Sequence, residues 1–354
     1  MTDDRGETHL VTIAVDANGA DLGPAEVAAG ASLAAGEGIR VLLFGPAAEM
    51  GSVAEGVEVV DSPISIAKTA EPAAAVRATP DASIVRAWRA VAAGEAQALV
   101  SGGSTGAALA AGLFNVKRAQ GIYRPALALP LPVPGHPVTL LDVGANNEVR
   151  TEHLVQFAFM GAAFMSTVLG VERPRVALLS NGEEATKGTP LVLETYKTLE
   201  ESEALNFIGN VEGRHITKGD VDVVVTDGFT GNIMLKLIEA VSEATVDIVD
   251  TAIKSNARSR LAGRLLAPAI HQVEAAIDPE GAGGAYLLGL RSLGVVPHGR
   301  FTRYGVSQAI KLAARGVTED VIARTHAALA AGHALRPSRD RAPAAGTPSV
   351  SSQA

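Results

Sequence analysis

Residues 221–239, VDVVVTDGFTGNIMLKLIE, change character near their middle. The first part is rich in valine, a small polar corner follows at Asp227 and Gly228, and a helix-like segment begins near Asn232. An aliphatic run without alternation is typical of a strand that is covered on both faces. The stretch therefore predicts a buried strand that leads through a polar corner into a helix.

The same pattern recurs along the chain. Strand, polar loop and helix follow one another at 11–24, 98–112, 138–158 and 176–188, and a further strand is predicted at 39–45. Strands that alternate with helices predict βαβ units and a mainly parallel sheet. Because the carboxyl ends of such strands lie along one edge, where ligands bind, we expect the five polar loops to surround one ligand.

Composition narrows the class of protein. The chain has 354 residues, is 47% hydrophobic, carries a net charge of −8 and contains no cysteine. The missing cysteines exclude disulfides, thiolate zinc sites and a cysteine nucleophile. The negative charge argues against nonspecific nucleic-acid binding, and the polar N-terminus lacks a signal-peptide pattern, so a cytoplasmic protein is expected.

Residues 154–171 run for eighteen positions without a charge, which is the lower limit for a membrane span. Gln156, Ser166 and Thr167 dilute this run, and no basic flank marks an orientation. The segment therefore predicts a helix that is buried in the core or in a subunit interface.

The polar loops have the chemistry of an anion site. Glycine-rich turns that lead into helices expose backbone N–H groups, and the helix dipole adds positive potential. Ser104, Thr105 and Gly106 stand before one predicted helix, Asn146 precedes another, and Asn232 begins a third. A phosphate could be held there without an arginine.

The loop GEEATKGT at 182–189 adds a lysine and two carboxylates. Glu183 and Glu184 would repel a phosphate unless they orient Lys187 or handle a proton. The alternative is a solvated lysine that pairs with one of these glutamates. Lysine and glycine are exchanged relative to the Walker phosphate loop, no GxGxxG follows a strand, and no cluster has metal-ligand spacing.

Taken together, these loops resemble those of the bacterial phosphate acyltransferases, the acyl-acyl carrier protein:phosphate transacylases of phospholipid synthesis. The matching stretches, in family order over about 10–315, are DANGADLGP (16–24), AVRATPDAS (75–83), SGGSTGA (101–107), GIYRPALA (121–128), DVGAN (142–146), EHLVQFAFMG (152–161), NGEEATKGT (181–189), NFIGNVEGR (206–214), DGFTGN (227–232), GGAYLLGL (283–290) and HG (298–299). The sequence departs from the family stretches at Asn18, Ala20, Ser104, Thr189, Tyr286 and Phe301. Asn18 and Ser104 remain polar, so these two bear on fine positioning and not on the chemistry.

This resemblance implies an enzyme that transfers a fatty acyl group from acyl carrier protein to inorganic phosphate, without cofactor or metal. Phosphate is itself the nucleophile, so no side chain need be acylated. The implied fold is a three-layer α/β/α sandwich with a mainly parallel sheet, similar to phosphotransacetylases and to isocitrate and isopropylmalate dehydrogenases. A homodimer is also implied.

The resemblance also assigns roles to the loop residues. Lys187 would carry the charge of phosphate or oxyanion, with Glu183 or Glu184 orienting it, while Asp16 and Asp227 would steer donors or take a proton. The implied phosphate-binding residues are Asn18, Gly19, Ser104, Thr105, Gly106, Asn146, Gly188, Gly228 and Asn232.

One catalytic domain is expected over residues 9–335, between a short tail at 1–8 and a Pro-, Ala- and Ser-rich, disordered tail at 336–354. Within it, residues 233–272 are predicted to protrude as a pair of helices, because apolar residues recur at helical spacing.

The tip of this pair is basic and apolar. Acyl carrier protein is acidic and the chain is net negative, so productive encounter needs a local basic patch. The tip could also touch anionic lipid at the inner face of the cell membrane and deliver product to the membrane glycerol-3-phosphate acyltransferase. The alternative is a solvated hairpin that only dimerises. The predicted contact residues are Lys254, Arg258, Arg260, Arg264, Leu265 and Leu266.

Three rival functions stay open at the level of sequence. A short-chain acyl-CoA:phosphate transacylase shares the phosphate chemistry, and a dehydrogenase shares the scaffold. A non-catalytic peripheral membrane scaffold is disfavoured by the GEEATKG and DGFTGN loops.

Overall fold

The structure is a computed structural model that describes residues 10–131, 133 and 136–337, so the predicted tail at 1–8 and most of that at 336–354 lie outside it. Its sheet has eleven strands in the order β3-β2-β1-β4-β11-β10-β5-β6-β9-β7-β8. The strands are β1 (Thr12–Asp16), β2 (Arg40–Gly45), β3 (Val57–Asp61), β4 (Ala98–Ser101), β5 (Ala126–Leu131), β6 (Val138–Leu141), β7 (Arg175–Leu179), β8 (Asn206–Val211), β9 (Val223–Val225), β10 (Ala285–Leu288) and β11 (Leu293–Val296).

The prediction of a mainly parallel sheet is confirmed, since seven of the ten neighbouring pairs are parallel. The three antiparallel pairs all involve β5 or β10 at the centre. They reverse the strand direction, so β1 to β4 and β11 run opposite to β6 to β9.

The expectation that all strand ends lie along one edge is therefore wrong. Neighbouring strands rotate by roughly 20–25°, and four steps separate β4 from β6, so the accumulated rotation is roughly 80–100°. The carboxyl ends of these two strands consequently turn toward a shared space instead of pointing in opposite directions.

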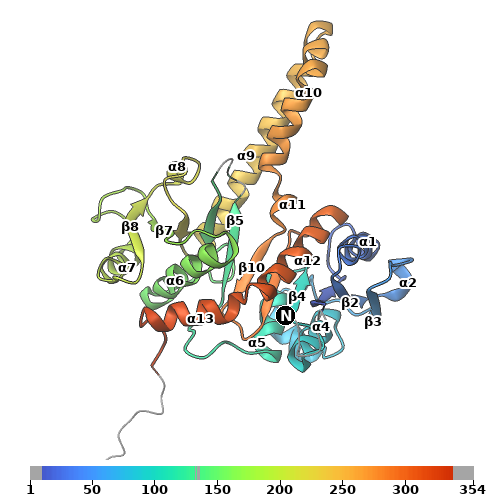
Figure 1. Cartoon of the computed structure of the whole chain (residues 1–354), viewed down its shortest axis with the longest axis horizontal. Coiled ribbons are helices and arrows are strands. Elements are labelled where there is room, and N and C mark those ends of the chain that lie inside the picture. Colours follow the sequence, from blue (N-terminus) through green and yellow to red (C-terminus); the bar gives the residue numbers. More distant parts are fainter. Residues whose placement is uncertain (1–9, 132, 134–135, 338–354) are drawn as a thin grey trace, which may run out of the picture.

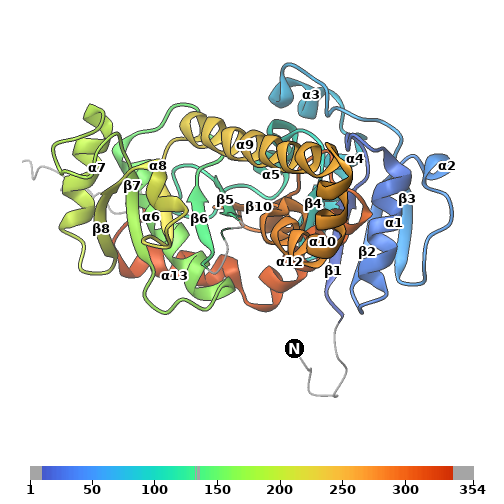
Figure 2. The same ribbon diagram turned by 90° about the horizontal axis from the view of Figure 1, so that it is seen from above.

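Helices cover both faces of the sheet, as Figures 1 and 2 show. One hydrophobic core joins the sheet to α1 (Pro24–Ala35), α6 (Thr151–Val168), α12 (Arg303–Thr318) and α13 (Val321–Ala331). The second joins it to α4 (Ser83–Ala93), α5 (Thr105–Asn115), α8 (Gly213–Ile216) and the start of α9 (Gly228–Lys254). The predicted three-layer α/β/α arrangement is thus confirmed. Further helices are α2 (Ala47–Met50), α3 (Pro72–Ala78), α7 (Pro190–Glu200) and α11 (Pro279–Ala282).

The uncharged run at 154–171 forms most of α6, and the prediction of a buried helix is confirmed. Its polar residue Gln156 is fully buried, where its amide accepts from Tyr123 N–H and donates to the carbonyl oxygens of Gly121 and Ala334. None of the helices within the described ranges combines the length and the apolar character that crossing a bilayer requires.

Two long helices, α9 and α10 (Ala257–Ile277), extend away from the body as a hairpin, which Figure 1 shows at the top. Asn256 begins α10 by accepting a hydrogen bond from the Ser259 N–H, which lets the chain reverse within two residues. The base of the hairpin stands over the middle of the sheet, between its two halves (Figure 2).

Candidate active site

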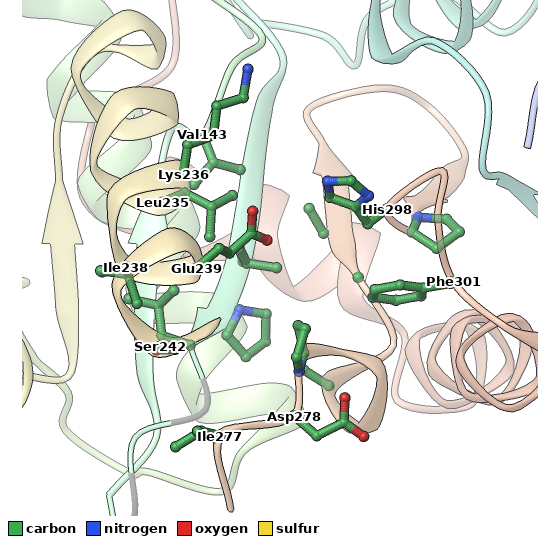
Figure 3. A pocket seen from close by; sticks show the side chains of 18 of the residues that line it. Val143, Leu235, Lys236, Ile238, Glu239, Ser242, Ile277, Asp278, His298 and Phe301 are labelled. Carbon is green, nitrogen blue, oxygen red and sulfur yellow. The ribbon is translucent and has the colours of Figure 1, made fainter. Parts of the chain in front are cut away.

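A cavity of about 1190 Å³ lies where the loops after β4, β6 and β11 meet α9. Gly103 follows β4, Gly144 follows β6 and His298 follows β11. Strand ends from both halves of the sheet therefore share one space. Figure 3 shows Leu235, Lys236, Ile238, Glu239 and Ser242 on the α9 wall, with His298 and Phe301 on the facing wall.

The cavity differs in character along its length. Lys236 lies at one end in Figure 3, and Ile277 and Asp278 lie at the other. The polar lining includes Thr105 at the start of α5, Asn232 and Lys236 on α9, His298 after β11, and the carboxylates of Glu239, Glu243, Asp247 and Asp278. The apolar lining comes from the sheet, α9 and the base of the hairpin, and includes Leu127, Leu129, Val143, Leu235, Ile238, Val246, Ile277, Val296 and Phe301. One space thus offers a polar region and a long apolar surface.

The first turn of α5 contributes to the polar region. Ser104 caps the helix by accepting a hydrogen bond from the Ala107 N–H. Within the described part of the chain, no backbone acceptor is recorded for the N–H groups of Thr105 and Gly106. Because Thr105 lines the cavity, this helix start offers backbone donors to an anion.

The loop after β6 is shaped by Asp142, a carboxylate that is fully buried. It accepts hydrogen bonds from the N–H groups of Leu127, Ala145 and Asn146 and from the Asn146 side chain. Burial raises the pKa of Asp142, while these hydrogen bonds oppose the rise. The Asn146 amide also donates to the Pro125 carbonyl oxygen, so it holds the loop.

Two glycines bring the start of α9 against this loop. The Gly228 N–H donates to the Asn146 carbonyl oxygen at 2.7 Å. A Cβ at Gly231 would lie 1.9 Å from the Asp142 carbonyl oxygen. Asp227 caps the helix, since its carboxylate accepts from the Thr230 N–H and hydroxyl. The backbone donors of this turn are therefore largely used within the protein, and Asn232, which follows it, lines the cavity.

Asp16, at the end of β1, belongs to a buried polar cluster. It accepts hydrogen bonds from the Ser101 hydroxyl at 2.9 Å and from the Asn18 N–H at 3.2 Å. Burial raises the pKa of Asp16 to about 6, although hydrogen bonds from Ser83, Ser101 and Asn18 lower it. The Asn18 amide donates to the Ser62 carbonyl oxygen and to the Ser83 hydroxyl, so it joins β1 to α4.

The loop at 181–189 lies after β7, and none of its residues is among those lining the cavity. Glu183 pairs with Arg214 at 2.6 Å and approaches His215 at 3.3 Å, both on α8. The Lys187 N–H donates to the Glu184 carbonyl oxygen. The loop contacts α8, whose last residue Ile216 lines the cavity.

Known proteins resemble this chain over most of its length. The family described as "Fatty acid synthesis protein" matches residues 11–324. Proteins named phosphate acyltransferase are 39% identical in Gloeothece citriformis, covering 89% of this chain and 92% of theirs, and 41% identical in Elusimicrobium minutum, covering 86% and 91%. This chain belongs to the phosphate acyltransferase family. It is an acyltransferase of fatty acid and phospholipid synthesis.

Solved structures with low sequence identity share the fold of this acyltransferase. A phosphotransacetylase from Streptococcus pyogenes superimposes with a TM-score of 0.57 at 17% identity, covering 88% of this chain and 94% of its own. The EutD phosphotransacetylase from Staphylococcus aureus gives 0.56 at 18% identity, covering 87% and 94%. The expected likeness to phosphotransacetylases is confirmed at the level of fold.

The structure brings some of the predicted site residues of the acyltransferase together. Thr105 and Asn232 line one cavity, although they are distant in sequence. The other predicted site residues of the body are not among its lining residues: Asp16, Asn18, Gly19, Ser104, Gly106, Asn146, Glu183, Glu184, Lys187, Gly188, Asp227 and Gly228. Their proposed roles stay predictions, and several of them hold the loops that form the cavity.

Three residues near the cavity were not predicted from the sequence to have a role. Asp142 lies within the DVGAN stretch, but a strand-end aspartate does not reveal that it will accept so many N–H groups. Lys236 follows Asn232 by four residues, the spacing that places two side chains on one face of a helix. His298 stands in the HG stretch, and its Nδ1 accepts from the Arg300 N–H at 3.3 Å. The neutral ring therefore carries its proton on Nε2.

The departures from the family stretches fall into two groups. Tyr286 is fully buried in β10, and its hydroxyl donates to the Leu312 carbonyl oxygen at 2.6 Å. Thr189 caps α7 through the Val192 N–H. Phe301, by contrast, lines the cavity and stacks on His298 with ring centroids 6.3 Å apart. Of these three departures, Phe301 is the one that alters the wall of the cavity.

Proposed function

We propose that this acyltransferase transfers a long fatty acyl group from acyl carrier protein to inorganic phosphate. The observation that carries the proposal is one cavity with a polar region and an extended apolar lining. Its volume of about 1190 Å³ exceeds the roughly 300–1,000 Å³ of ordinary small-ligand pockets. Such a space suits a reaction in which an anion attacks the carbonyl group of a long apolar chain.

In the reaction, an oxygen of hydrogen phosphate attacks the thioester carbonyl carbon, and the carbon–sulfur bond breaks. The phosphate proton passes to the departing thiolate, so the products are acyl phosphate and the carrier thiol. Donors at the polar region, such as the N–H group of Thr105 and Nε2–H of His298, can stabilise the oxyanion that develops. The protein otherwise acts by holding phosphate and carbonyl together.

A phosphate-dependent thiol release assay tests this function. Palmitoyl-acyl carrier protein should release its thiol only when phosphate is added, and hydroxylamine should trap the acyl phosphate. Palmitoyl-CoA and acetyl-CoA serve as alternative donors. Faster turnover of acetyl-CoA than of palmitoyl-acyl carrier protein would favour the short-chain transacylase instead.

The apolar stripe on α9 supports a homodimer. Phe229, Ile233, Leu237 and Val241 follow at intervals of four, and each is more than half exposed in the single chain. Such a stripe along a helix is covered in soluble proteins by another element, and a second copy of the hairpin offers the same surface. Light scattering of L237E V241E should give a monomer mass; an unchanged dimer would reject this surface.

The residues at the tip of the hairpin support a contact with carrier protein or with the inner face of the cell membrane. Leu265 and Leu266 are exposed beside Arg258 and Arg264, for which no ion pair is recorded within the described residues. Lys254 is partly neutralised, because it pairs with Asp250 at 2.5 Å. An apolar and basic tip matches an anionic surface, from which product could pass to a membrane acyltransferase.

A further inference from the structure

Lys236 is a cation within the cavity that no sequence motif singled out. It lies one turn after Asn232 on α9, and both residues line the cavity. Its ammonium points toward the end of the cavity that lies opposite Ile277 and Asp278 in Figure 3. The fold thus directs a positive charge to one end of a cavity whose lining also includes the carboxylates of Glu239, Glu243, Asp247 and Asp278.

This charge has no recorded protein partner among the described residues. Arg300, the other strong base of the lining, pairs with Glu243 at 2.5 Å. Glu239 lies three residues after Lys236 and also lines the cavity, but no ion pair joins the two. Lys236 is exposed and no carboxylate is recorded in an ion pair with it among the described residues, so its ammonium is available to an anionic ligand.

The surroundings of Lys236 favour an anion as well. Thr105 belongs to the same lining and begins α5 with backbone N–H groups that have no recorded backbone acceptor within the described residues. Gly144 lies close to the Asn232 side chain, since a Cβ there would be 3.7 Å from the Asn232 Cγ. The missing side chain leaves room beside Asn232.

We propose that Lys236 is the residue that binds a substrate phosphate group in this cavity. The inference rests on the proposed function and names the cation of the site. The same chemistry could come from two sources, inorganic phosphate or the phosphodiester in the prosthetic arm of the carrier protein. With its phosphate end at Lys236, a substrate would extend its acyl chain along α9 toward the base of the hairpin.

The test compares wild type with K236M, which keeps the length of the side chain and removes the charge. Loss of a charge-assisted hydrogen bond should weaken phosphate binding by on the order of 10- to 100-fold. The matched control is K197M, an exposed helical lysine on α7 that does not line the cavity. K236R should recover part of the affinity, because it restores the charge.

Three measurements on the full chain separate the outcomes. A higher KM for phosphate in K236M, with an unchanged KM for palmitoyl-acyl carrier protein, would assign the lysine to inorganic phosphate. The reverse pattern would assign it to the phosphodiester of the carrier. Calorimetric titration with phosphate and with holo-carrier checks binding without turnover.

Unchanged binding of both ligands by K236M would overturn the inference, provided that its melting temperature matches that of K197M. If K236M does not fold, K236Q and K236R carry the same comparison. Wild-type enzyme that binds phosphate through Lys236 but releases no thiol would overturn the proposed function and leave this inference standing.

Discussion

The body and the hairpin of this acyltransferase use apolar residues in opposite ways. In the body, β1, β4, β6, β9, β10 and β11 consist entirely of buried residues. Among the residues of α9 and α10 whose exposure is described, the buried ones are three glycines: Gly228, Gly231 and Gly263. These glycines lie where the hairpin approaches the loop after β6 or where its two helices approach each other, and the large apolar side chains of the hairpin are at least partly exposed.

This difference separates what stabilises the chain from what the chain can contact. The body finds partners for its apolar side chains within itself, so each contributes to folding. The exposed stripe and tip of the hairpin gain nothing until another surface covers them. We infer that the hairpin is the part of the molecule that binds other proteins or membranes. Substitutions in the body and in the hairpin test this difference between the two regions.

The largest effect on stability is expected from Trp88→Ala in the body. Trp88 is fully buried on α4, and its Nε1–H donates to the Ala108 carbonyl oxygen at 2.9 Å. Removing the ring leaves a cavity, and the free energy of unfolding should fall by about 3–5 kcal/mol. Urea unfolding followed by circular dichroism measures this loss.

The matched change in the hairpin is Leu265→Ala. Leu265 is 76% exposed, so the same measurement should find a change within about 0.5 kcal/mol. A loss for Leu265→Ala comparable to that for Trp88→Ala would mean that the hairpin tip is already covered in solution.

The second effect is a pH dependence that comes from Asp16. Its folded pKa of about 6 lies above the unfolded value of 3.8, so the folded protein binds the proton more tightly. Its favourable contribution to stability is therefore full below the unfolded pKa and is lost as pH rises through 6. The loss amounts to about 3 kcal/mol.

Asp16→Asn should remove this pH dependence, because the amide does not titrate. Melting temperatures between pH 4 and pH 8 should fall more steeply in wild type than in the variant over that window. Parallel curves for the two proteins would contradict a raised pKa at Asp16.

The third effect concerns the junction between body and hairpin. Gly231→Ala would place a Cβ against the Asp142 carbonyl oxygen, and overpacking of this kind should cost about 1–3 kcal/mol. Gly281→Ala is the control, since a Cβ there meets nothing within 4 Å. Equal melting temperatures for both variants would show that α9 can shift away from the loop freely.

The smallest effect on stability, but a large one on contact, is expected from L265E L266E at the tip. Both leucines are exposed, so unfolding should change little, while flotation with anionic vesicles should be lost. Leu33→Glu serves as the control, because Leu33 is an exposed leucine on α1 of the body. Vesicle binding that survives the tip substitutions would exclude the tip as the membrane contact.

The sequence itself was sufficient to predict the strand, loop and helix units. Runs such as 138–141 and 176–179 are apolar because both faces of those strands are covered, and this local requirement is visible in the residue pattern. The strands β5, β10 and β11 escaped notice, since each is short or interrupted by glycine or proline. The family was also recognisable from the sequence, because the loop stretches match those of the family in the same order.

Tertiary structure alone decided which loops share a space. The antiparallel strands at the centre reverse half of the sheet, and pairing between distant strands depends on packing that no local pattern encodes. The sequence therefore singled out Lys187, a lysine in a polar loop, whereas the fold places Lys236 in the cavity. A motif records which side chains are present, but the direction in which each one points is set by the elements that carry it.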